Sequence, residues 1–252
     1  MGPLGFVWLR VGLAALLLLA LNARALRTAG TRPLRWVIAG GAAVAFMNAC
    51  FYQAIDRIPL GLATTVEFLG PLAVAVLGSR RALDFLWIAL AGAGVALLGS
   101  PGVELDPVGL AFAFGAAVGW AAYILLAKRM LEDWPLGTGL SLTLLVAAVL
   151  LAPFGLAAGG SDLLDPAVLA VGLAVAVLGS VLPFALELAA LRQLTPATFG
   201  ILLSLEPAVA AFAGALVLSQ VPNTVEALAI VLVIAASAGA SLGARRVVPP
   251  EM

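Results

Sequence analysis

Long apolar runs recur from one end of this chain to the other, and they restrict its possible folds more than any other feature. Each run extends for about 20 residues, which as a helix is enough to cross a hydrocarbon layer of ~30 Å. A membrane barrel would instead show short segments of alternating apolar and polar residues. The composition agrees, since 63% of the 252 residues are hydrophobic and 10% are charged, against ~25% charged in soluble domains. The sequence predicts an all-α membrane protein.

The apolar windows predict a polytopic bundle of about nine transmembrane helices. We place the spans at residues 4–21, 36–55, 60–78, 84–100, 108–127, 138–157, 168–191, 197–218 and 226–243. The connections between them are too short to hold a soluble domain. Any functional site is therefore expected within the membrane.

Basic residues distinguish the two sides of the membrane. Alternate connections carry Arg24, Arg27, Arg32, Arg35, Arg80, Arg81, Lys128, Arg129, Arg192, Arg245 and Arg246. The opposite connections carry Arg57 with the acidic residues Asp56, Glu104, Asp106, Asp162 and Asp165. Because Lys and Arg are retained on the cytoplasmic side, we expect a cytoplasmic C-terminus and, with nine spans, an N-terminus outside.

An internal repeat relates the two halves of the chain. Superposing VEFLGPLAVAV (66–76) on LLSLEPAVAAF (202–212) aligns Pro71 with Pro207, an offset of 136 residues (207 minus 71). The same offset relates four of the spans to four later ones, and equivalent helices run in opposite directions, as in many secondary transporters.

One span of the second half has no counterpart in the first. Shifted back by the same offset, span 108–127 falls before Met1. We therefore expect a ten-helix inverted-repeat fold that lacks its first helix. Its halves are predicted at 1–101, with four transmembrane helices, and at 102–252, with five.

The segments FMNACFYQAIDRIPLGLATTVEFLGPLAVAV (46–76) and LPFALELAALRQLTPATFGILLSLEPAVAA (182–211) resemble the EamA-type drug/metabolite transporter superfamily, and within it the threonine/homoserine exporter branch. GWAAYILLAKR (119–129) is similar to the start of that family's second half. The resemblance implies a ten-helix inner-membrane exporter of amino acids or related small metabolites that exchanges them for protons. Because the first helix is absent, a passive channel or a non-transporting membrane subunit is the alternative.

Ionisable residues inside the spans are the best indicators of a site, because a charge in the membrane is costly unless it faces a cavity or a partner. Four side chains qualify: Arg10, Glu67, Glu187 and Glu206. In the repeat Glu67 and Glu206 lie one helical turn apart on equivalent helices. Each is close to a helix-breaking proline, Pro71 or Pro207.

These features predict that the carboxylates face a water-filled central cavity between the repeats, where they bind substrate or carry protons. The structural alternative is that Glu67 is buried in its protonated form, or paired with Arg10 for stability.

Polar and aromatic residues supply further candidates. Asn48 and Tyr52 share one helix face at i and i+4, where they could bind the ammonium and carboxylate of an amino acid. Asn48 is equally suited to bridging helices. Trp120 and Tyr123 are candidates for the cavity wall, although aromatic residues there are more often packing residues.

The sequence argues against enzymatic chemistry. The chain contains no histidine and a single cysteine, Cys50, so we expect no catalytic residues, no metal site and no cofactor. It has no phosphate-binding loop, and any proton coupling must use the membrane carboxylates.

The expected partners are the lipid bilayer, an amino-acid-like substrate and protons, with no nucleic acid. Small residues at every fourth position, Ala111, Gly115 and Gly119, allow close packing within the bundle or between two protomers of a possible homodimer.

Overall fold

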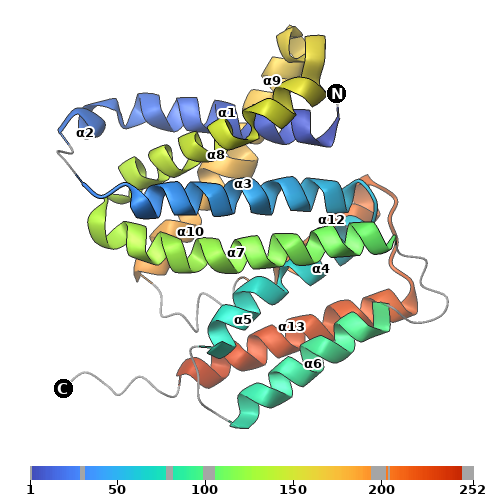
Figure 1. The fold of residues 1–252 in the computed structure, drawn as a ribbon. Helices are drawn as coiled ribbons and strands as arrows, with labels where there is room; N and C mark the ends of the chain where they lie inside the picture. Colours follow the sequence, from blue (N-terminus) through green and yellow to red (C-terminus); the bar gives the residue numbers. More distant parts are fainter. Residues whose placement is uncertain are drawn as a thin grey trace, which may run out of the picture. The chain divides into compact units, whose positions relative to one another are not determined.

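A computed structural model describes residues 2–28, 32–77, 82–98, 106–193, 203 and 205–245, and these residues form helices joined by short turns and loops, with no strand among them (Figure 1). The elements are α1 (Pro3–Leu21), α2 (Ala23–Thr28), α3 (Arg35–Ile55), α4 (Leu60–Glu67), α5 (Leu69–Leu77), α6 (Ala82–Leu98), α7 (Pro107–Asp133), α8 (Leu136–Gly159), the 3-10 turn η1 (Gly160–Leu164), α9 (Pro166–Ala176), the π-helical turn η2 (Val177–Val181), α10 (Leu182–Gln193), α12 (Glu206–Val217) and α13 (Thr224–Arg245).

The helices follow the apolar windows of the sequence. Five helical stretches are long and apolar enough to cross a membrane: Pro3–Leu21, Arg35–Ile55, Pro107–Asp133, Leu136–Leu164 and Pro166–Ala190. Shorter apolar helices lie at Leu60–Val74, Glu206–Val217 and Thr224–Gly239, and α6 covers the remaining window. The predicted all-α membrane bundle is confirmed.

Two compact units make up the chain. One consists of residues 1–52 and 122–192, which we call unit 1, and the other of residues 53–121 and 193–252, which we call unit 2. Each unit takes segments from both predicted repeat halves. The division of the chain at residue 101 therefore stays a prediction about the repeat.

In unit 1, α1 lies antiparallel along α8 (Figure 1). The Trp8 indole nitrogen Nε1 donates a hydrogen bond of 3.0 Å to the carbonyl of Ala148. Gly155 lies directly against Trp8, because a Cβ at position 155 would be 2.2 Å from the Trp8 Cβ. At the other end of this pair, Asn22 lies against Gly137. Small residues let the two backbones approach closely, as is common between membrane helices.

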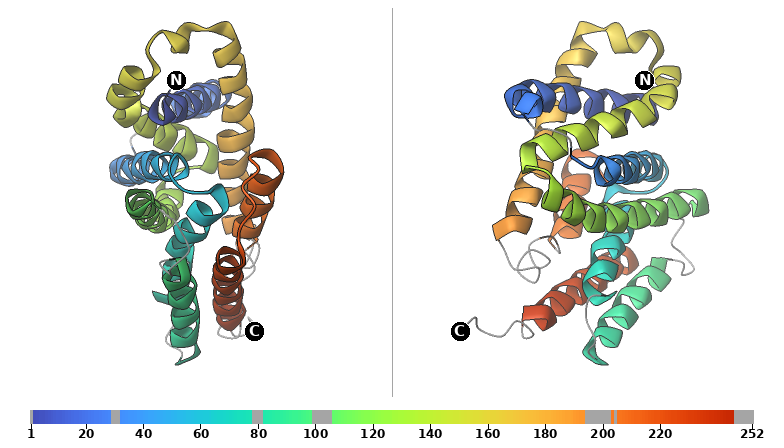
Figure 2. Two further views of the ribbon diagram at one scale, coloured as in Figure 1. Left: turned by 90° about the vertical axis from the view of Figure 1, so that its right-hand side faces the viewer. Right: turned by 60° about the vertical axis from the view of Figure 1, so that its left-hand side comes forward.

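In unit 2, α6 lies antiparallel along α13, as both views of Figure 2 show. The Trp87 ring packs against Gly239, and Gly94 packs against Ala229 and Val233. Helix α4 packs against α12, where a Cβ at Gly61 would lie 2.8 Å from the Cα of Ala211.

Two predicted spans are interrupted rather than continuous. Span 60–78 is divided into α4 and α5 at Phe68, and span 168–191 contains the π-helical turn η2 between α9 and α10. A proline follows each interruption: Pro71 supplies no N–H to the carbonyl of Glu67, and Pro183 supplies none to the carbonyl of Gly179, each four residues earlier. These carbonyls are released from the regular helical pattern, so they are available to other groups.

Candidate functional site

Arg10 is a buried cation in the middle of α1, with 8% of its surface exposed. One terminal guanidinium nitrogen donates to the carbonyl of Gly179 in η2, and the other donates to Oδ1 of Asn48 on α3. The Tyr52 ring lies 5.3 Å from the guanidinium carbon, within cation–π distance. Three elements of unit 1 thus meet around one positive charge.

The local sequence makes two acceptors available for the hydrogen bonds that Arg10 donates. The Gly179 carbonyl lacks its regular helical donor because residue 183 is proline. The Asn48 amide is oriented by its Nδ2, which donates 2.9 Å to the carbonyl of Val44 one turn earlier. Oδ1 is therefore directed away from its own helix and accepts from Arg10.

Tyr52 belongs to an aromatic wall beside Arg10. Its ring centroid lies 6.3 Å from that of Phe6 on α1 and 6.3 Å from that of Phe51. The structure thus brings together Arg10, Asn48 and Tyr52, which the sequence offered as candidates on two separate spans.

Unit 1 also buries hydrogen-bonding atoms that no protein group uses in the described part of the chain. They are Arg10 Nε, Ser180 Oγ, Tyr123 OH and Thr143 Oγ1, and each of these residues is at least nine-tenths buried. Ser180 directly follows Gly179, which accepts from Arg10. Because an unsatisfied buried polar atom costs ~1–3 kcal/mol, these atoms favour a bound polar molecule in the interior.

The surroundings of Arg10 in the described residues of its unit hold hydrogen-bond acceptors and an aromatic ring. Within the described part of unit 1, no carboxylate lies at ion-pair distance from the guanidinium. A buried cation is costly unless a counter-charge or dipoles stabilise it. The cluster of Arg10, Asn48, Tyr52 and Ser180, which we call the Arg10 cluster, therefore has the chemistry to bind a small carboxylate.

Two further candidates lie in unit 1. Tyr123 on α7 is fully buried and packs edge-on against Phe184, with ring centroids 5.6 Å apart. Glu187 is half-buried and follows Phe184 by one turn on α10.

The remaining candidates lie in unit 2. Glu67 is the last residue of α4 and is 7% exposed, directly before the break at Phe68. Trp120 packs edge-on against Phe68, with ring centroids 5.8 Å apart. Glu206 is exposed at the start of α12, and Pro207 beside it is buried. A common cavity for these residues and the Arg10 cluster stays a prediction, as does the pairing of Glu67 with Arg10.

Sequence reasoning missed Gly179 and Ser180. The signal that could have revealed them is the run GSVLP at 179–183, which places small residues and a proline inside an otherwise apolar span. Interrupted spans of this kind indicate binding sites in transporters.

Comparison with known proteins identifies the family. The model of the EamA-like transporter family matches residues 107–242. The threonine/homoserine exporters RhtA of Salmonella typhimurium (strain LT2) and Escherichia coli (strain K12) are each 39% identical to this chain over 249 residues, which cover 97% of this chain and 84% of each relative.

The fold is also found in a solved structure. A protein crystal structure with 20% sequence identity superposes on this chain with a TM-score of 0.66, and the match covers 99% of this chain and 90% of the chain in that structure. The family match and the relatives agree with the resemblance seen in the sequence, and this chain belongs to the EamA-like transporter family.

Proposed function

We propose that this protein is a secondary transporter of the inner membrane that exports threonine, homoserine or similar small amino acids in exchange for protons. The names of the relatives support this substrate class, because proteins 39% identical to the chain are threonine/homoserine exporters. Threonine and homoserine share an α-carboxylate, an α-amino group and a side-chain hydroxyl, so one site needs to satisfy these three groups.

The observation that carries the proposal is the buried guanidinium of Arg10. Its terminal nitrogens are used by Gly179 and Asn48, while Nε is not used by any protein group in the described part of the chain. The substrate α-carboxylate would bind at Nε and supply a negative charge. Hydrogen bonds to charged groups contribute ~1.5–3 kcal/mol each, which is enough to anchor a small ligand that transport must later release.

Neighbouring groups fit the rest of the substrate. Ser180 follows Gly179 in the sequence and is buried, and its hydroxyl can both donate and accept hydrogen bonds. It suits the substrate hydroxyl or amine. The Tyr52 ring beside Arg10 would cover one side of the short aliphatic part.

Proton exchange requires groups that change charge during the cycle. Arginine stays protonated, and the chain contains no histidine. The acidic candidates inside the spans are Glu67, Glu187 and Glu206. Glu67 is the one that the structure buries at a helix break, so we assign the coupled proton to Glu67.

Flux measurements on purified protein in liposomes test this function. The rate of threonine transport should saturate with threonine concentration. It should increase when protons flow down their gradient in the direction opposite to threonine. Arg10→Gln should abolish it, and Arg10→Lys should keep little activity, because an ammonium lacks the fixed planar donors of a guanidinium. Threonine amide, which lacks the carboxylate, should not compete with threonine.

Two outcomes would contradict the proposal. Flux that is linear in concentration and insensitive to the proton gradient would indicate a passive channel. Threonine transport at the parental rate by a folded Arg10→Gln protein would remove Arg10 from the substrate site.

A further inference from the structure

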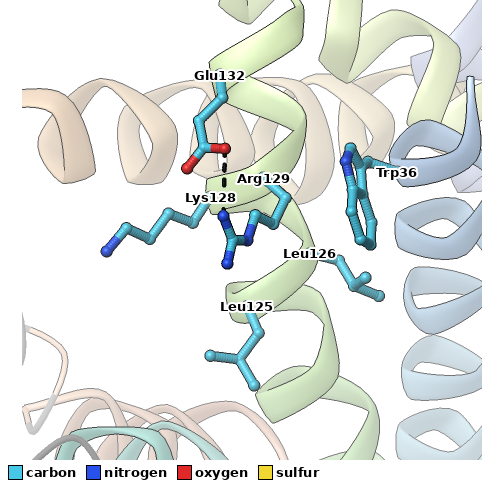
Figure 3. A pocket seen from close by; sticks show the side chains of 6 residues that line it. All are labelled: Trp36, Leu125, Leu126, Lys128, Arg129 and Glu132. Carbon is cyan, nitrogen blue, oxygen red and sulfur yellow. Dashed lines mark hydrogen bonds and ion pairs between the residues drawn. The ribbon is translucent and has the colours of Figure 1, made fainter. Parts of the chain in front are cut away.

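A second site lies at the charged end of α7, on the surface of unit 1. It is a pocket of about 460 Å³ lined by Trp36 of α3 and by Leu125, Leu126, Lys128, Arg129 and Glu132 of α7 (Figure 3). The volume is within the range of sites that hold small organic molecules. The Arg10 cluster uses none of these residues.

The lining changes from apolar to charged along α7. Leu125 and Leu126 line the pocket one turn before Lys128 and Arg129, and Leu125 is 56% exposed. Trp36 on α3 lies on the side of α7 from which Leu126 projects (Figure 3). The pocket therefore has an apolar end toward the middle of the span and a cationic end toward its terminus, which is the polarity of a phospholipid.

The residues around this pocket are those typical of the boundary between membrane and water. Trp134 at the end of α7 donates 2.9 Å through Nε1 to the carbonyl of Pro33, and the guanidinium of Arg32 lies 6.0 Å from the Trp134 ring. Arg35 stacks on Trp36 at 4.9 Å. Tryptophan with Lys and Arg marks the membrane interface, and the excess of basic residues marks the cytoplasmic leaflet.

The net charge of the pocket is positive. Arg129 pairs with Glu132 at 3.5 Å (Figure 3). No carboxylate in the described part of the chain lies at ion-pair distance from Lys128. One cation is thus available for an external anion, and Arg129 can turn to the same anion because its own ion pair is exposed.

We propose that this pocket binds an anionic phospholipid of the cytoplasmic leaflet. Its phosphate contacts Lys128 and Arg129, and the first part of an acyl chain lies on Leu125 and Leu126. The Trp36 indole packs at the level of the glycerol. Basic pockets on the cytoplasmic side of membrane helices bind anionic head groups in this way.

Lipid binding to the purified full-length protein tests the site. Native mass spectrometry would count bound phosphatidylglycerol and phosphatidylcholine over a range of added lipid. We expect one phosphatidylglycerol to bind more tightly than any phosphatidylcholine. Lys128→Gln with Arg129→Gln should weaken it about 25-fold, at roughly fivefold for each lost charge.

The matched control is Arg24→Gln with Arg27→Gln, which removes two basic charges from α2 of the same unit. This variant should bind phosphatidylglycerol as tightly as the parent protein. Equal losses in both double variants would indicate diffuse attraction to a basic surface and would overturn the assigned site. Parental binding by the Lys128 and Arg129 variant would overturn it as well.

A crosslinking measurement on the unaltered protein tests the site even if the Lys128 and Arg129 double variant does not fold. Phosphatidylglycerol with a photoreactive group on its first acyl carbons should label α7 near Leu125 in the unaltered protein, and inorganic phosphate should not compete. Labelling confined to other helices, or full competition by phosphate, would exclude the lipid.

Discussion

Replacing Glu67 with its neutral analogue glutamine separates a role in proton coupling from a role in stability. It is 7% exposed at the end of α4, beside the break at Phe68. If Glu67 carries the coupled proton, Glu67→Gln keeps the shape of the side chain and removes its charge, so the fold should persist. We expect the Tm in detergent to change by no more than ~3 °C, about 1 kcal/mol for a chain of this size, while proton-driven threonine transport is lost.

Glu226→Gln is the control for this substitution. Glu226 lies at the start of α13, where its Oε2 accepts 2.8 Å from the backbone N–H of Asn223 in a capping box that glutamine also supports. It should transport as the parent does. Proton-driven transport by a stable Glu67→Gln protein would show that another carboxylate carries the proton. A large fall in Tm would indicate that Glu67 is mainly a stabilising partner.

At the scale of elements, Gly70 determines how closely α5 approaches α7 in unit 2. A Cβ at position 70 would lie 2.2 Å from the carbonyl oxygen of Ala117, which is backbone and cannot rotate away. Gly70→Ala must therefore push the two helices apart. We expect a loss of ~1–3 kcal/mol, typical of overpacking, and a lower Tm in detergent.

Gly92 on α6 provides the matched substitution. Nothing lies within 4 Å of the position where its Cβ would be. Because alanine is also a better helix former than glycine, Gly92→Ala should unfold at the same temperature as the parent or slightly above it. Equal melting of the Gly70→Ala and Gly92→Ala proteins would contradict the close contact between α5 and α7.

At the scale of the whole molecule, the basic residues predict the orientation in the membrane. Arg and Lys lie near the end of α7 and before α3, whereas acidic residues lie in the η1 connection. Cys50 is buried, so a cysteine introduced elsewhere should react without much background. A membrane-impermeant maleimide should label Ser161→Cys in intact cells and Glu132→Cys only after the membrane is opened. The reverse pattern would overturn the predicted cytoplasmic C-terminus.

The sequence by itself determined the class of fold and the positions of the spans. In a bilayer every backbone polar group must be satisfied within the segment, so an apolar run of sufficient length becomes a helix wherever it occurs. That information is local, and each of the nine windows contains a helix in the described residues. The sequence also indicated Arg10 and Glu67 as candidate site residues, because a charge inside an apolar run is visible without any tertiary contact.

Only the tertiary structure decided which groups meet. Hydropathy does not reveal that Arg10 reaches Asn48, 38 residues away, and Gly179, 169 residues away. Nor does it show that span 168–191 contains a π-helical turn. The break of span 60–78 at Phe68, in contrast, lies just before Pro71, which the sequence already marked as helix-breaking. The Arg10 cluster depends on helix packing, and packing is set by close approach at glycines and by carbonyls that prolines release from the helix, which act between segments far apart in the chain.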